Sequence, residues 1–374
     1  MTNKERTMAV LHDQPYDRMP VVYFGYWKSL LHKWHAEGHI TKGEAETGFR
    51  DGSAADRSIG KKLGFDFNWQ PYYCPNETLF PPFPITVLEE LPGGAQKVQN
   101  QNGIVVLRKA NVADAIPMEF DHLLKDRVSW ETHYLPRLSY CAERLRPELL
   151  KEAAEVSARD GAPLALHCGS LYGELRNWMG FEGLCYLSAD DEDLYDEIIN
   201  TIGQLSYDVV SHALESGYTF DYAHFWEDIC FKNGPMISPA MFREKVAPWY
   251  QKICGLLNRS GIDIISVDCD GVVDSLLPIW LESGVNTMFP VEVGTWKASI
   301  APWRERYGSA LKAVGGMEKS VLSGDYSDVD REIERLRPLI DLGGYIPCPD
   351  HRLPLDTKWE TVQYYCDRMK ALTR

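Results

Sequence analysis

Side chains suited to catalysis gather at the end of one apolar run. The stretch IDIISVDCDG begins with β-branched apolar residues and ends in Asp268, Cys269 and Asp270. Residues two apart on a strand face the same side, so Asp268 and Asp270 would lie together. Such a pair can hold a metal, or one member can carry a proton because the second charge raises its pKa. Alternatively, the two acids could cap a following helix, whose N-terminus favours negative charge.

Two further runs end in similar side chains. GGYIPCPDHRLP ends in Cys348, Asp350, His351 and Arg352. A neighbouring carboxylate orients an imidazole for metal binding or proton transfer, although hydrogen bonding within a loop would use the same residues. Cys348 could be a ligand or a buried thiol that packs as a small hydrophobe. FDYAHFWEDI ends in Glu227, which could be an acid, a ligand or a helix cap.

These residues make up the predicted site. We predict that the catalytic residues are Asp268, Asp270, His351 and Glu227, and that Asp268, Asp270, Cys348 and His351 would bind a divalent metal. The residues predicted to bind substrate are aromatic, polar or basic and lie at strand ends: Tyr23, Tyr26, Trp27, Asn68, His167 and Arg352. The aromatic group would suit a flat ligand, but aromatic clusters also form ordinary core. His167 could equally be a hydrogen-bonded, half-buried histidine.

Parallel strands that alternate with helices would bring these positions together. We count eight candidate strands: Val21–Phe24, GFDFNWQPYY, Pro163–Leu166, FDYAHFWEDI, IDIISVDCDG, NTMFPVE, LKAVGGME and GGYIPCPDHRLP. Helical patterns follow most of them, which predicts an α/β fold of the (β/α)8 TIM-barrel type rather than an open sheet. In such a barrel the chemistry lies at the carboxyl ends of the strands.

The whole chain, 1–374, is predicted to form one domain with one insertion. In the N-terminal half, residues 85–108 carry the turn signals Pro92-Gly93-Gly94 and Asn102-Gly103 between apolar runs. Such signals are typical of β-hairpins, so we expect hairpins that decorate the barrel. No glycine-rich nucleotide-binding motif follows any predicted strand, which argues against a dinucleotide-binding domain.

The composition narrows the classes of function. The chain has 374 residues, a formal net charge of −15 and 44% hydrophobic residues. A surface this acidic repels phosphate backbones and anionic lipids, so we expect no binding to nucleic acid or membranes. No apolar run reaches the roughly 20 residues that cross a bilayer, and the N-terminus lacks the apolar core of a signal peptide. We therefore expect a cytoplasmic protein whose nine scattered cysteines are mostly buried thiols.

Four segments resemble the uroporphyrinogen decarboxylase superfamily: EDICFKNGPMISPAMFREKVAPWY, VDCDGVVDSLLPIWLESGVNTMFPVE, AVGGMEKSVL and GGYIPCPDHRLPLD. The resemblance implies a TIM barrel and one of two activities, tetrapyrrole decarboxylation or corrinoid-linked methyl transfer. The decarboxylases grip substrate carboxylates with an arginine-rich motif after the first strand. The matching region here, YFGYWKSLLHKW, has no arginine. A substrate with eight carboxylates needs bidentate arginines, so the methyltransferase side is favoured.

The metal site that this resemblance implies is altered in the present chain. Thiol-directed methyltransferases of the superfamily carry a His-x-Cys pair, commonly with zinc, where this chain has Asp268 and Asp270, and a second cysteine that Cys348 could match. Carboxylates favour harder metals or acid–base work. What remains resembles the demethylating members.

The predicted function is transfer of a methyl group from a small methoxy or methylamine-type compound to a corrinoid on a partner protein. A divalent metal, zinc among the candidates, could assist, and the chain could form a homodimer. Two alternatives remain open: a decarboxylase of a smaller carboxylated substrate, and a non-catalytic barrel that binds a corrinoid or tetrapyrrole.

Overall fold

Eight parallel strands form the centre of the fold. The computed structural model describes residues 1–109 and 118–372. Six strands form one parallel sheet in the order β14-β13-β12-β11-β8-β7, and β1 pairs with β2 in a separate parallel pair. Their bounds are β1 Val22–Tyr23, β2 Phe67–Asn68, β7 Ala165–His167, β8 Tyr222–Trp226, β11 Ile265–Asp268, β12 Thr287–Val291, β13 Lys312–Met317 and β14 Tyr345–Pro349.

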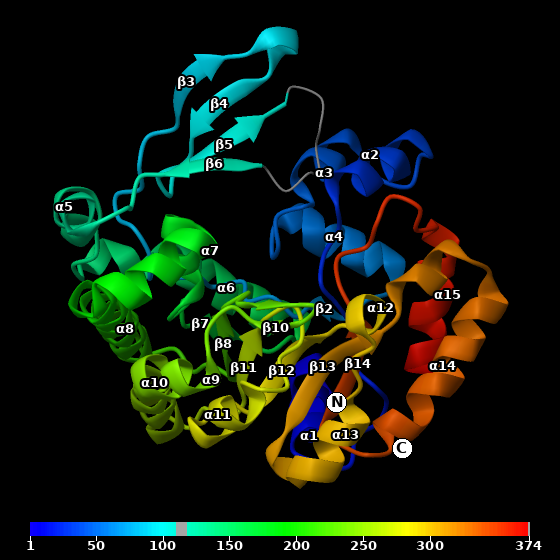
Figure 1. The fold of residues 1–374 in the computed structure, drawn as a ribbon. Helices are drawn as coiled ribbons and strands as arrows, with labels where there is room; N and C mark the ends of the chain where they lie inside the picture. Colours follow the sequence, from blue (N-terminus) through cyan, green and yellow to red (C-terminus); the bar gives the residue numbers. More distant parts are fainter. Residues whose placement is uncertain (110–117, 373–374) are drawn as a thin grey trace.

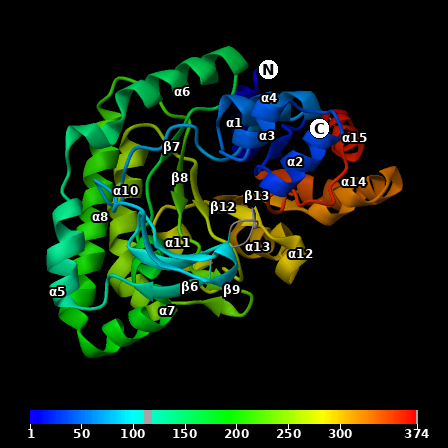
Figure 2. The ribbon, with the colours of Figure 1, turned by 90° about the horizontal axis from the view of Figure 1, so that it is seen from above.

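Two isolated bridges join the β1–β2 pair to both edges of this sheet. Tyr26, after β1, pairs in parallel with Leu353, after β14, and Tyr73, after β2, pairs in parallel with Leu166 of β7. The eight strands therefore follow one another around a ring, with helices outside it (Figures 1 and 2). The predicted (β/α)8 fold is confirmed, and every predicted strand contributes to the ring.

The helices follow the predicted alternation closely. The longer ones are α2 Lys28–Ala36, α3 Lys42–Thr47, α4 Ala54–Leu63, α6 Pro147–Asp160, α7 Gly173–Asp190, α8 Glu192–Leu214, α10 Ala247–Arg259, α11 Leu277–Glu282, α13 Ile300–Tyr307, α14 Tyr326–Ile340 and α15 Trp359–Lys370. After β11 the chain becomes helical only at Leu277. The backbone N–H of Val272 instead donates to Phe231 O at 2.9 Å, which holds a loop beside the mouth of the barrel. No helix in the described part of the chain is long and apolar enough to cross a bilayer.

The insertion is larger than the sequence indicated. It forms a four-stranded antiparallel sheet of β3 (Thr86–Glu90), β4 (Gln96–Gln99), β5 (Ile104–Arg108) and β6 (Glu119–His122). The predicted insertion, 85–108, stops before β6, because EFDH is short and mostly polar and residues 110–117, outside the described residues, separate it from β5. Figure 1 shows this sheet projecting from the barrel beside α7.

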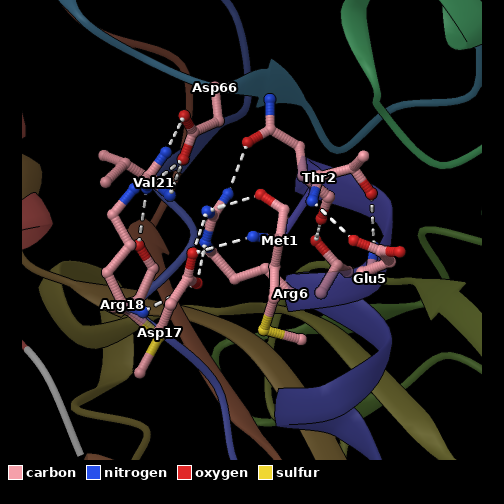
Figure 3. A network of polar contacts seen from close by, with 11 residues as sticks. Met1, Thr2, Glu5, Arg6, Asp17, Arg18, Val21 and Asp66 are labelled. Carbon is pink, nitrogen blue, oxygen red and sulfur yellow. Dashed lines mark hydrogen bonds and ion pairs between the residues drawn. The ribbon is translucent and has the colours of Figure 1, made fainter.

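The N-terminal segment closes the end of the barrel at which the strands begin. Helix α1 (Asn3–Leu11) starts with a capping box between Thr2 and Glu5. The Arg6 guanidinium donates to both oxygens of Asp17, at 2.7 and 2.8 Å (Figure 3). Arg18 forms a bidentate pair with Asp66, which directly precedes β2. These contacts fix the N-terminal segment at the end of the barrel where the strands begin, and the candidate site lies at the opposite end, as is usual in this fold.

Candidate active site

Aromatic rings fill the barrel interior below the site. Trp69 stacks on Tyr222 with ring centroids 4.6 Å apart. One layer higher, Phe289 of β12 contacts Phe24 at 4.6 Å and His224 at 5.9 Å between centroids. All five side chains are buried. The polar side chains that end the strands therefore stand on an apolar base, where their charges are poorly screened.

Asp268 is a deeply buried acid at the carboxyl end of the barrel. It ends β11 and is 4% exposed. Gln70 Nε2 donates to its Oδ2 at 2.6 Å, and His224 Nε2 lies 4.0 Å from the same oxygen. Burial, and then the charge of Asp270, raises the pKa of Asp268 well above its usual value. This shift favours the protonated form of Asp268 more than in a solvent-exposed aspartate.

Asp270 and His351 face one another from the segments that directly follow β11 and β14. His351 Nε2 lies 3.5 Å from Asp270 Oδ2, and both side chains are partly exposed, at 24% and 34%. The His351 ring stacks on Trp27 at 5.9 Å and meets the edge of Phe24 at 5.1 Å. The imidazole is therefore fixed between an aromatic wall and a carboxylate, in reach of solvent.

Two more acids surround this pair. Burial and the neighbouring Asp270 charge raise the pKa of Asp228 and of Glu292. Glu292 Oε2 accepts from the Gly271 N–H at 2.6 Å, which secures the turn after Asp270. Asp228, Asp268, Asp270, Glu292 and His351 are named here the strand-end cluster. Four carboxylates close together make this region strongly attractive to cations.

The nearby cations are already paired with acids. Both terminal guanidinium nitrogens of Arg352 donate to the Asp51 carboxylate. Arg176 lies 3.6 Å from Asp228. Lys319 Nζ lies 3.6 Å from Asp350, which also accepts from backbone N–H groups of the segment after β12. None of these three is free to grip a substrate carboxylate without breaking an existing pair.

Glu227, predicted to be catalytic, lies outside the strand-end cluster. It is fully buried. Its carboxylate accepts from the backbone N–H groups of Leu171, Tyr172 and Gly173 at 2.7 to 3.0 Å. Tyr250 OH also donates to it. The carboxylate thus holds the first turn of α7 against β8, the helix-capping alternative that the sequence left open.

The predicted metal ligands are not brought together. Cys348 is fully buried, and its thiol lies near Tyr365 of α15, on the helix side of β14 rather than beside Asp268. Within the described residues, no three His, Cys, Asp or Glu side chains are placed to hold a metal ion. The donor set therefore does not fit zinc, which favours three or four converging nitrogen and sulfur ligands.

The predicted substrate-binding residues divide into two groups. Tyr23 and Tyr26 are 1% exposed and stack on one another, so they belong to the core. Asn68 is also buried; it donates to Asp51 at 3.0 Å, and its Oδ1 accepts from the Gln70 N–H. Trp27, His167 and Arg352 remain partly exposed at the strand ends.

Sequence reasoning missed three contributors: Phe24, Gln70 and Phe289. No charge or regular spacing in the sequence identifies these residues as part of the site, because each joins it through a contact with a segment far away in the chain. The Gln70–Asp268 hydrogen bond joins β2 to β11, which lie far apart in the sequence. Position at a strand end was the one available signal for Gln70.

The comparisons with known proteins address the family and the fold. A solved methyltransferase from Methanosarcina mazei has a TM-score of 0.64 and 15% identity over 99% of this chain and 98% of that one. A putative vitamin-B12 independent methionine synthase from Listeria monocytogenes has a TM-score of 0.41 and 12% identity, over 95% and 97%. No curated protein matches the chain. The family model described as Uroporphyrinogen decarboxylase (URO-D) matches residues 76–372, so this protein belongs to the uroporphyrinogen decarboxylase family.

Proposed function

We propose that this protein is a methyltransferase that removes a methyl group from a small methylated compound and delivers it to a corrinoid carried by a partner protein. The observation that carries the proposal is the strand-end cluster: four carboxyl groups and one imidazole, beside the Trp27 ring, with Arg176, Lys319 and Arg352 already paired with acids. The family resemblance to corrinoid-linked methyltransferases supports the same conclusion.

The charge of the cluster argues against tetrapyrrole decarboxylation. A substrate with many carboxylates would meet the acidic groups of the cluster, while Arg176, Lys319 and Arg352 beside it are already paired with acids. A methylated ammonium group is attracted both by carboxylates and by the face of an aromatic ring. A methoxy compound is neutral and is not repelled. The site therefore favours methylated amines and ethers over polycarboxylic acids.

The residues of the cluster can assist the departure of the demethylated product. When the methyl group leaves, the C–N or C–O bond breaks and its electron pair stays on the heteroatom. For an ether oxygen, a proton from Asp268 or from protonated His351 neutralises the charge that develops there. Asp270 keeps the imidazole oriented towards the mouth. The corrinoid, when bound, supplies the cobalt nucleophile that accepts the methyl group.

No metal is part of this proposal, because no three His, Cys, Asp or Glu side chains among the described residues are placed to hold one. The test uses cob(I)alamin as acceptor. Four methyl donors are offered to the purified protein: choline, ethyltrimethylammonium, 2-methoxyphenol and methoxybenzene. We expect methylcobalamin to form with at least one donor, and formation to be lost in His351→Gln and Asp270→Asn.

The chain contains a matched control pair. His12 Nε2 lies 3.0 Å from Asp263 on the opposite end of the barrel, so His12→Gln and Asp263→Asn remove a similar contact away from the cluster. These variants should retain the wild-type rate. If the wild-type protein methylates cob(I)alamin with none of the four donors, or if His351→Gln is as active as His12→Gln, the proposal is wrong.

A further inference from the structure

A second polar cluster lies beside the strand-end cluster and is not used by the proposed methyl transfer. It consists of Glu77, in the loop after β2, His167 at the end of β7, Glu174 in the first turn of α7, and His224 within β8. His167 Nδ1 lies 3.2 Å from Glu77 Oε1. The rings of His167 and His224 are 6.3 Å apart between centroids, and His224 Nε2 is 4.0 Å from Asp268. We name this group the His–Glu cluster.

His224 carries the argument. It is fully buried, yet neither ring nitrogen has a hydrogen-bond partner. A neutral imidazole has one N–H donor and one bare acceptor nitrogen, and leaving either of them unpaired away from water destabilises the folded protein. Hydrophobic residues would satisfy the packing at this position without that cost. An unpaired polar side chain at the base of a site therefore indicates that a ligand completes it.

A second unpaired atom points the same way. Glu174 Oε2 is buried and has no hydrogen-bond partner. Burial raises the pKa of Glu174 to about 7, so that its carboxyl group is partly protonated at neutral pH. Although burial opposes the charged form of His167, the adjacent Glu77 carboxylate raises its pKa above the usual value. The cluster thus offers both hydrogen-bond donors and acceptors, and the His167 side chain is 21% exposed.

The chemistry of these groups selects among possible ligands. A carboxylate would face Glu77 and Glu174 and be repelled. An ammonium group only donates, so it would leave the N–H of His224 unpaired. A hydroxyl group both donates and accepts and is small enough to lie beside a buried ring. It is therefore the group that can satisfy an unpaired donor and an unpaired acceptor together.

From these contacts we infer that the His–Glu cluster binds a hydroxyl group of the methyl donor, so that the substrate is a small hydroxylated methyl compound. The inference rests on the proposed function and specifies its substrate class. The methylated end would lie at Asp270, His351 and Trp27, and the hydroxyl end at His167 and His224. Asp268 is the member of the strand-end cluster that lies beside the His–Glu cluster, with its Oδ2 4.0 Å from His224 Nε2.

The test compares donors that differ only in the hydroxyl. Ethyltrimethylammonium is choline without its hydroxyl, and methoxybenzene is 2-methoxyphenol without its hydroxyl. Binding to the full-length protein is measured by calorimetry. We expect the hydroxylated member of at least one pair to bind about 3–10-fold more tightly, the gain that one or two net hydrogen bonds provide. The preference should disappear in His224→Leu and fall in Glu174→Gln and His167→Gln, with affinity for the hydroxyl-free member unchanged.

The possible outcomes separate this inference from the proposed function. If both members of every pair bind with equal affinity while methylcobalamin still forms, the hydroxyl subsite is wrong and the methyl transfer stands. In that case the His–Glu cluster holds ordered water only. If no member of either pair binds, the inference falls together with the proposed function. If His224→Leu does not fold, two measurements still test the hydroxyl subsite. One is the affinity difference within each donor pair for the wild-type protein, and the other is the same difference for His167→Gln, whose substitution lies at a partly exposed position.

Discussion

His351 and Asp270 meet at the mouth of the barrel, with Nε2 and Oδ2 3.5 Å apart, although they follow the last and the fifth strands of the ring. We expect Asp270→Asn and His351→Gln each to lower methyl transfer by roughly 10²–10⁴-fold, the usual contribution of an oriented acid or base. Because the two act as a unit, the double variant should lose little more than the worse single variant. If the rate losses of the two single variants multiply in the double variant, the two residues do not act as a pair. The measurement is the steady-state rate of methyl transfer to cob(I)alamin.

Cys348 should be dispensable for activity. Its buried thiol lies beside Tyr365, away from the strand-end cluster. We expect Cys348→Ala to keep the wild-type rate and metal content, and to lose about 1 kcal/mol of stability from the smaller buried side chain. Elemental analysis and urea denaturation provide the measurements. Activity that disappears together with bound zinc would show that Cys348 is a ligand after all.

Glu227 should matter for folding rather than for chemistry. Its carboxylate accepts backbone N–H groups at the start of α7 and the hydroxyl of Tyr250. In Glu227→Gln an NH2 group would face some of these donors, so we expect a loss of about 1–3 kcal/mol in the free energy of unfolding. Hydrogen exchange at Leu171 to Gly173 should rise. A variant of wild-type stability that has no activity would instead restore Glu227 as a catalytic acid.

Asp56 makes stability depend on pH. Burial, followed by the charge of Asp51, raises its pKa from 3.8 to about 7. Because the pKa is higher in the folded than in the unfolded chain, its contribution is full below about pH 4. As the pH rises to 7, this contribution to the free energy of unfolding falls by on the order of 4 kcal/mol.

The Asp56→Asn variant removes this ionisation. Its stability relative to wild type should therefore increase from pH 4 to pH 7 and level off above it, as followed by urea denaturation at each pH. The exposed Asp263→Asn variant is the control and should show no such rise. A constant difference between Asp56→Asn and wild type over this range would contradict the assignment.

Gly203 permits close packing of α8 against α10. A Cβ atom at this position would overlap the ring of Trp249. Gly203→Ala should therefore destabilise the protein by about 1–3 kcal/mol, although alanine favours a helix. Gly255 on α10 is the matched control, since its nearest neighbour is the flexible end of Arg259 at 3.5 Å. Gly255→Ala should stabilise the protein by up to about 1 kcal/mol, because alanine has the higher helix propensity, and the melting temperature should rise slightly.

The sequence alone determined the ring of strands and the positions of most polar strand ends. Both are local patterns: an apolar run that stops at an acid or a histidine can be recognised without knowing its neighbours. Thus IDIISVDCDG marked Asp268 and Asp270 as polar residues at a strand end, and GGYIPCPDHRLP marked His351, whose Nε2 lies 3.5 Å from Asp270 Oδ2 in the structure.

Only the tertiary structure decided which of those polar residues face one another. Glu227 turns to the N–H groups of α7, and Cys348 turns to α15, because the direction of a side chain at a strand end depends on the helix that packs there. The unpaired nitrogens of His224 are likewise invisible in the sequence, since they result from the absence of partners on several neighbouring strands. Contacts between distant segments fix such features, and local patterns carry no information about them.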